Sequence, residues 1–194
     1  MLSKDYILGF VEGEGCFNIT LQRYVDYHTR KTKRSNSKKL NAFPFRVKPS
    51  FRIVCAKRDQ KVLEEIREII GVGEIYTNYR KNSTKHQNIA HYYVQTLSDL
   101  IKVRDFFKNC IFMTTKGSDF NYWCQCLDII YLKKHQTKEG FLEICRIRGL
   151  MNTHSGKTTM WKPTEIAKVF TEEKKYILAH LDIKKQKLLH NNYC

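Results

Sequence analysis

The sequence lacks the features of a secreted protein, of a protein stabilised by structural zinc, and of a membrane-spanning protein. It has seven cysteines, an odd number, and no Cys-x-x-Cys pair, which argues against a disulfide framework or a structural zinc site. No apolar run approaches the roughly 18 residues of a transmembrane helix. Residues 1–6 resemble neither a secretory signal nor an Arg-rich transit peptide, so we expect the protein to act where it is made, without a membrane partner.

Acidic residues are also scarce. The 194 residues include 35 Lys and Arg but only 19 Asp and Glu, which gives a formal net charge of +16. Such a surplus is typical of proteins that bind nucleic acid. An anionic membrane surface is the competing partner, although it usually requires a basic amphipathic helix rather than strands. A hydrophobic content of 42% excludes a disordered tail and predicts a packed core.

Changes in apolar periodicity predict an α+β fold. Ser3 can cap a helix over residues 4–12, and Gly71 can end another over 59–70. From Cys16 the period changes to two, which indicates a strand reaching Asp26. Three more strands are expected around residues 46–53, 74–80 and 91–95, and helices at about 98–109, 117–134, 138–151, 163–169 and 172–189. The expected order is αββαββα, with one four-stranded sheet whose apolar face is covered by helices.

The polar face of the second strand is strongly basic. Its outward positions are Arg46, Lys48, Ser50 and Arg52. Pro49 indicates that this strand lies at the edge of the sheet or contains a bulge. Eleven Lys and Arg, and no acidic residue, occur between Tyr27 and Arg58, whereas a surface built only for solubility would mix the two signs.

The loop over residues 28–42 adds to this charge, because six basic residues fall between Arg30 and Lys39. It is either a solvated loop, a nuclear-localisation-like patch, or an arm that lies along phosphates. We favour the arm, because the two strands that the loop joins are themselves polar and basic on one face.

The end of the first helix is the strongest candidate for chemistry. Gly9 and Gly13 lie four residues apart, a spacing that lets two helices approach closely. Glu12 and Glu14 follow in the turn, beside the cationic sheet. Carboxylates facing phosphates require a cation between them, and Mg²⁺ takes carboxylate and phosphate oxygens. The alternative is a helix end with incidental surface glutamates.

The remaining motifs give little evidence for a functional site. Gly156-Lys157-Thr158-Thr159 lacks the upstream glycine and the preceding strand of a phosphate-binding P-loop. The cysteines at 110, 124, 126 and 145 and the tryptophans at 123 and 161 are expected to fill the core.

The segment Leu8-Gly-Phe-Val-Glu-Gly-Glu-Gly-Cys-Phe17 resembles the motif of the LAGLIDADG homing endonucleases of the single-motif type. Further segments fall where that family has them. These are Phe51-Arg-Ile53, Ile70-Gly-Val-Gly73, Met113-Thr-Thr-Lys116 with Asp119-Phe120, Phe141-Leu-Glu-Ile-Cys145 and Lys157-Thr-Thr159. The resemblance covers roughly residues 4–160, so we expect an endonuclease domain over 1–160 and a helical extension of that domain over 161–194.

The resemblance implies the αββαββα LAGLIDADG fold with an antiparallel sheet as a saddle on double-stranded DNA. A single motif implies a homodimer whose motif helices meet through Gly9 and Gly13, on a long pseudo-palindromic target. By the same resemblance, Glu14 and the Gly13 carbonyl hold a divalent cation, Mg²⁺ or another such as Mn²⁺. Lys116 matches the basic residue near the scissile phosphate, and Cys55 stands where the family often has a water-orienting Gln.

The resemblance also assigns base readout to the outward strand positions. These are Asn18, Thr20, Gln22, Arg46, Lys48, Ser50, Arg52, Tyr76, Asn78, Arg80, His91, Tyr93 and Gln95. Lys57, Arg58 and Lys157 are expected to contact the DNA backbone.

Three functions remain open on the sequence. The first is a site-specific, metal-dependent endonuclease that makes double-strand cuts and promotes intron mobility. The second is an intron-encoded maturase that binds intron RNA to assist splicing, and the third is a degenerate transcription regulator. Glu14 and Lys116 favour the enzyme, whereas Cys55 favours the other two. A composition rich in Lys, Ile, Asn, Tyr and Phe predicts an organelle, either chloroplast or mitochondrion, as the place of synthesis.

Overall fold

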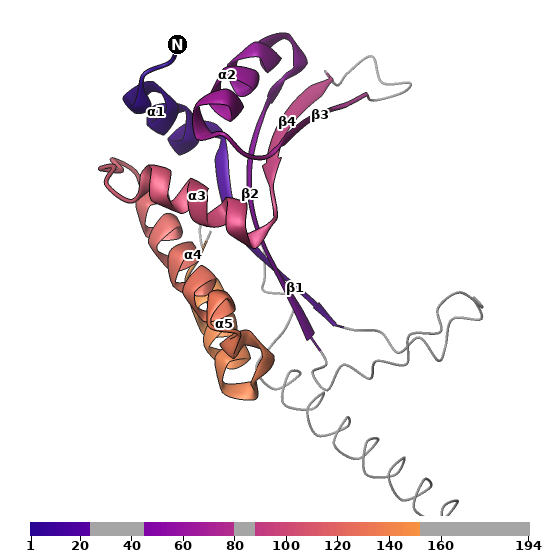
Figure 1. The fold of residues 1–194 in the computed structure, drawn as a ribbon, viewed down its shortest axis with the longest axis vertical. Helices are drawn as coiled ribbons and strands as arrows, with labels where there is room; N and C mark the ends of the chain where they lie inside the picture. Colours follow the sequence, from indigo (N-terminus) through magenta and orange to yellow (C-terminus); the bar gives the residue numbers. More distant parts are fainter. Residues whose placement is uncertain (24–44, 80–87, 152–194) are drawn as a thin grey trace, which may run out of the picture. The chain divides into compact units, whose positions relative to one another are not determined.

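The structure is a computed structural model that describes residues 1–23, 45–79 and 88–151 (Figure 1). The chain divides into two compact units, Met1–Gln22 with Val47–Ser155, and Arg23–Arg46 with Gly156–Cys194. Nearly all described residues belong to the first unit. Within the described ranges, no helix has the length and apolar character needed to cross a membrane. The predicted basic loop, the helices after residue 160 and the domain boundary at 160 lie outside these ranges.

The observed order of elements confirms the predicted αββαββα arrangement. In chain order the elements are α1 (Lys4–Glu14), β1 (Gly15–Arg23), β2 (Phe45–Ala56), η2 (Lys57–Asp59), α2 (Gln60–Ile70), β3 (Glu74–Asn78), β4 (Ile89–Val94), α3 (Leu97–Phe107), α4 (Lys116–Tyr131), η3 (Lys134–Gln136) and α5 (Lys138–Leu150).

The four strands form one antiparallel sheet in the order β1-β2-β4-β3. β2 is therefore an internal strand, so of the two alternatives given for Pro49, an edge position or a bulge, the edge position is wrong. The ladder between β2 and β4 begins at Phe51, opposite Val94, and ends at Ala56, opposite Ile89. Pro49 lies two residues before this ladder starts, so its missing N–H breaks no hydrogen bond to β4.

The helix ends follow from local chemistry. The Ser3 hydroxyl accepts a hydrogen bond from the Tyr6 amide at 3.1 Å, as the predicted cap requires. Gly71 ends α2 with a left-handed φ of +78°, which glycine adopts at no steric cost. α1 runs two residues further than predicted, to Glu14. Gly15 then turns the chain into β1, and a Cβ there would lie 2.5 Å from the Val11 carbonyl oxygen.

The core lies between the apolar face of the sheet and the helices. Phe17 of β1 packs against Phe51 of β2 with ring centroids 5.1 Å apart. On its other side Phe17 meets Phe120 and Trp123 of α4, at 5.2 and 5.1 Å. These aromatic side chains are almost fully buried, with Trp123 confirmed as a packing residue. The inward face of β1 is thus fixed from two directions.

The cysteines of the helical segments fill the core only in part. Cys126 is buried, whereas Cys124 and Cys145 are half-buried. Cys110 is also half-buried and lies beyond the end of α3. Burial raises the pKa of Cys124 and of Cys126 to about 12, so both thiols stay protonated at neutral pH.

The helices after the sheet brace its first strand. Figure 1 shows α4 and α5 side by side. From α5, the Arg148 guanidinium donates a hydrogen bond at 2.7 Å to the carbonyl oxygen of Ile19 in β1, 129 residues earlier. The contact positions α5 against β1, the strand that directly follows the motif helix α1.

Candidate active site and nucleic-acid interface

The Glu14 side chain is exposed at the last residue of α1. Among the described residues, no hydrogen bond or ion pair occupies its carboxylate. The carbonyl of Gly13 belongs to the last turn of the same helix, where carbonyls lack the partner that a continuing helix would supply. The turn therefore presents two kinds of hard oxygen ligand at one place.

Glu12, two residues earlier, is held in place. Its Oε1 atom accepts hydrogen bonds from the backbone amides of Met113 and Thr114, both at 2.7 Å. The Thr114 amide, followed by the Thr114 hydroxyl and the Met113 amide, holds the pKa of the Glu12 carboxyl below its usual range. The two glutamates of the motif thus differ sharply in their surroundings.

Lys116 begins α4 and reaches the same turn. Its Nζ atom donates a hydrogen bond at 2.7 Å to the carbonyl oxygen of Gly15. Its backbone amide donates to the Thr114 hydroxyl at 3.2 Å. The structure therefore places the Lys116 ammonium one residue from Glu14, although the two are 102 positions apart in the sequence.

Cys55 also lies near this turn. It is half-buried near the end of β2, opposite Ala90 of β4. Burial raises the pKa of the Cys55 thiol, and the negative charges of Asp59 and Glu14 raise it further. Lys116 is therefore held one residue from Glu14 at the end of α1, and the charge of Glu14 acts on the Cys55 thiol.

A metal ion would find only part of its coordination shell here. Within the described ranges, no group of three or more His, Cys, Asp or Glu side chains could hold an ion by itself. The Glu14 carboxylate and a carbonyl are suited to a hard divalent cation, which commonly takes one or two carboxylates and completes its shell with phosphate oxygens and water. The donor set fits a cation that binds together with a nucleic acid.

The outward face of β1 and β2 is polar and basic. On β1, the Asn18 amide donates a hydrogen bond to the Thr20 hydroxyl at 2.9 Å, which confirms that these two side chains share a face. On β2 the exposed cations are Arg46, Lys48 and Arg52. Ser50 departs from the prediction, because its exposed fraction is only 6%. Although Ser50 belongs to the alternating series of outward positions on β2, its side chain is not accessible for contact with DNA.

The outward face of β3 and β4 carries an aromatic cluster, Tyr76, His91 and Tyr93. The Tyr76 and His91 rings stack, with centroids 4.6 Å apart and planes 7° apart. Tyr93 meets Tyr76 edge-on at 6.4 Å. Burial, with a smaller effect of Arg52, lowers the pKa of His91, and neither ring nitrogen has a hydrogen-bond partner in the part of the chain that the structure describes. His91 is therefore a neutral, stacked ring in the free protein.

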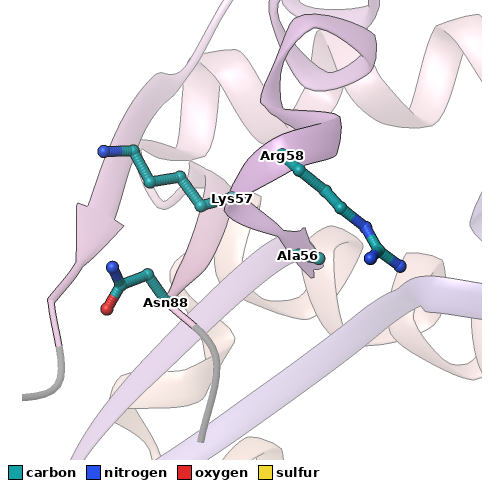
Figure 2. Close-up of a pocket in the computed structure, with 4 residues that line it drawn as sticks. All are labelled: Ala56, Lys57, Arg58 and Asn88. Atoms are coloured by element: carbon teal, nitrogen blue, oxygen red, sulfur yellow. The ribbon is translucent and has the colours of Figure 1, made fainter.

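A shallow open hollow lies where β2 ends, lined by Ala56, Lys57, Arg58 and Asn88 (Figure 2). Figure 2 shows the Lys57 and Arg58 side chains extending in opposite directions. The Lys57 ammonium donates to the Tyr79 hydroxyl at 2.8 Å and lies 4.3 Å from the centre of that ring. The Arg58 Nε atom lies 3.6 Å from the Asp59 Oδ2 atom, and both side chains are exposed. Of these two predicted backbone contacts, Lys57 therefore has an aromatic partner and Arg58 only an exposed ion pair.

The remaining predicted contacts divide into two groups. Gln22, Asn78 and Gln95 are exposed, as expected for contact residues. Arg80 and Lys157 lie outside the described residues. The sequence analysis missed the Glu12 contacts and the Tyr79 support of Lys57. No local signal pointed to the Glu12 contacts, because their donors lie 101 and 102 residues further along the chain.

Comparison with known proteins gives a consistent result. A sequence profile described as LAGLIDADG endonuclease matches residues 7–127. The crystal structure of the homing endonuclease I-TnaI is 31% identical, with a TM-score of 0.64 over 88% of this chain and 97% of that one. The meganuclease I-SmaMI, bound to uncleaveable DNA, is 28% identical, with a TM-score of 0.63 over 79% of this chain and 46% of that one.

A sequence relative points the same way. The protein named Probable intron-encoded endonuclease 3, from Neurospora crassa, is 26% identical over 145 residues. The match covers 74% of this chain and 24% of the relative, so the chain spans about a quarter of that protein's length. The profile match, together with the fold and the motif turn, shows that this chain belongs to the LAGLIDADG endonuclease family.

Proposed function

We propose that this protein is a site-specific homing endonuclease. It makes metal-dependent double-strand cuts in a long pseudo-palindromic DNA target and so promotes the mobility of an intron. The observation that carries the proposal is the end of α1, where the Lys116 ammonium is held one residue from the exposed Glu14 carboxylate, in a domain whose sheet has exposed cations on its outward face. The DNA-bound I-SmaMI structure and the name of the Neurospora relative support it.

The cofactor is Mg²⁺, or another divalent cation such as Mn²⁺. Glu14 and the Gly13 carbonyl would hold it, because both offer hard oxygen ligands at the end of one helix. When bound, such an ion lowers the pKa of water and stabilises negative charge on phosphate oxygens. The need for phosphate oxygens in the shell makes DNA binding a condition for metal binding.

Lys116 and Cys55 serve the same phosphate. The Lys116 ammonium stabilises the charge that develops on the scissile phosphate, once it leaves or shares the Gly15 carbonyl. Cys55 remains a neutral thiol, since burial raises its pKa. A thiol is a weak hydrogen-bond donor and orients water less firmly than an amide would. Lys116 therefore contributes more to the rate than Cys55.

The active enzyme is a homodimer. Space is open beside Gly9 and Gly13, where an added Cβ would meet nothing within 4 Å, and α1 buries Ile7, Leu8 and Val11 on its other side. A second α1 can therefore approach closely along this glycine face. The match to 46% of the I-SmaMI chain is consistent with this chain supplying half of a cleavage unit. With DNA bound, the sedimentation mass should equal that of the duplex plus twice 23.1 kDa. A protein contribution of 23.1 kDa both with and without DNA contradicts the dimer.

Glu14→Gln tests the metal assignment. The amide keeps the shape of the side chain but removes the charge that holds the cation, so DNA cleavage should fall about a thousandfold, the equivalent of several kcal/mol. Duplex binding should change by less than about threefold, because phosphate contacts supply most of the affinity. Single-turnover cleavage and a binding titration measure the two effects.

The matched control is Glu65→Gln, which removes an exposed carboxylate from α2. Its cleavage rate should equal that of the wild-type protein. A Glu14→Gln protein that cuts at the wild-type rate shows that the metal assignment is wrong.

Cys55 favours a second candidate, an intron-encoded maturase that uses the same basic face to bind intron RNA. A protein that binds nucleic acid without cutting it does not need to orient a water molecule, so a thiol at position 55 would do no harm. Tight binding of intron RNA, together with no cleavage of any DNA target, would establish this second function instead.

The place of synthesis is an organelle. The relative from Neurospora crassa is described as intron-encoded, and its host is a fungus, which has no chloroplast. We therefore favour the mitochondrion.

A further inference from the structure

We propose that Glu12 is a positioning residue that sets the place of Lys116 through the segment between α3 and α4. This inference rests on the proposed function, because it assigns Glu12 a role in the same reaction. Unlike Glu14, Glu12 is not assigned to the metal ion, because its carboxylate already accepts two backbone hydrogen bonds.

The proposal stands on an unbroken chain of contacts. The Glu12 carboxylate accepts hydrogen bonds from the Met113 and Thr114 amides, both at 2.7 Å. The Thr114 hydroxyl in turn accepts a hydrogen bond from the Lys116 amide at 3.2 Å. The Lys116 ammonium closes the ring at the Gly15 carbonyl, three residues after Glu12.

Packing alone does not fix this segment. Phe112 is anchored among aromatic side chains, with its ring 5.2 Å from that of Phe120. On either side of it, Ile111 and Met113 are 80% and 84% exposed and bury little apolar area. The two residues that follow Phe112 are therefore placed chiefly by Glu12. Hydrogen bonds to a carboxylate are about twice as strong as neutral ones, which suits a single side chain to this task.

The position matters because of where α4 begins. Lys116 is the first residue of α4, and Thr115, which precedes the helix, makes no side-chain capping hydrogen bond. Thr114 consequently supplies the hydrogen bond to the first amide of the helix. Without Glu12, the start of α4 loses the two hydrogen bonds that tie it to α1, the helix that carries Glu14, and the Lys116 side chain keeps only its own bond to the Gly15 carbonyl.

The test compares Glu12→Ala, Glu12→Gln and a control, Glu143→Ala. The alanine variant should bind duplex DNA within about twofold of wild type but cut it about a hundredfold more slowly, the loss that a displacement of about 1 Å can cause. The glutamine variant retains an oxygen acceptor and should recover at least tenfold of that loss, about 1.4 kcal/mol. Glu143 accepts two hydrogen bonds from Arg146 away from the site, so its removal should leave the rate unchanged.

A second measurement does not depend on cleavage. Amide hydrogen exchange should show Met113 and Thr114 protected in the wild-type protein and exposed in Glu12→Ala, with a shift in the Lys116 Cε resonance. An alanine variant that cuts at the wild-type rate overturns the proposal, as does one whose Lys116 resonance does not move. If the wild-type protein cuts no DNA, the proposed function fails, and these exchange and resonance data alone decide whether Glu12 positions Lys116.

Discussion

The inward and outward faces of the sheet are carried by the same strands but are built differently. Inward, Phe17 and Phe51 pack on each other and are almost fully buried. Outward, Lys48 and Arg52 of β2 are exposed, and the aromatic cluster on β3 and β4 stands beside them. Apolar packing decides which face the helices cover, and the other face is then free to carry charge. Substitutions on the two faces should therefore separate stability from DNA affinity.

The largest expected effect lies on the inward face, at Phe17. Phe17→Ala removes a ring that contacts both β2 and α4, and should lower the free energy of unfolding by about 3–5 kcal/mol. Urea denaturation measures the change. Gln22→Ala, on the exposed side of β1, is the control and should shift it by less than about 0.5 kcal/mol. Equal effects at both positions would mean that the two faces do not differ as described.

A smaller effect is expected on the outward face, at Arg52. Arg52→Ala should weaken duplex binding by about 1–3 kcal/mol if the guanidinium reads a guanine, and leave the free energy of unfolding nearly unchanged. The salt dependence of binding sharpens the assignment, since a phosphate contact would instead lower the slope by about one. Lys61→Ala removes an exposed cation from α2 and should leave binding as it was. A wild-type affinity for the Arg52 variant contradicts the interface.

The smallest effect concerns the pH response of His91. Its pKa lies below the ordinary value of 6.5 because of burial and Arg52, so the unfolded chain binds more protons than the folded one. Stability should therefore fall as the pH drops from 6.5 towards the lowered pKa. His91→Phe keeps a ring against Tyr76 and should reduce this fall, as thermal unfolding between pH 7.5 and 5.5 would show. An unchanged pH response places the titrating group elsewhere.

Local patterns were sufficient to predict most of the fold. The change to a period of two at Cys16 predicted strand β1, and Ser3 and Gly71 marked two helix ends, because each signal lies within a few residues of its effect. The same reasoning failed for Pro49, since a proline indicates a missing hydrogen bond but not the strand order. It also failed for Ser50, which the alternation places on the outward face but whose exposed fraction is only 6%.

The candidate site was predictable only in its components. The family motif pointed to Glu14 and Lys116, but not to how they are held. Glu12 meets Met113 101 residues away, and Arg148 meets Ile19 across 129 residues. Contacts at such separations leave no periodic trace in the sequence. They depend on how the helices pack, which the sequence pattern describes only in outline.

The most direct test of the central claim is cleavage of a DNA library of intron-insertion-type sequences, with Mg²⁺ and with EDTA. The proposed function predicts discrete double-strand cuts in Mg²⁺ and none in EDTA, because Glu14 needs a divalent cation to act on a phosphate. Cuts that persist in EDTA, or tight binding with no cut in Mg²⁺, would contradict a metal-dependent endonuclease centred on Glu14.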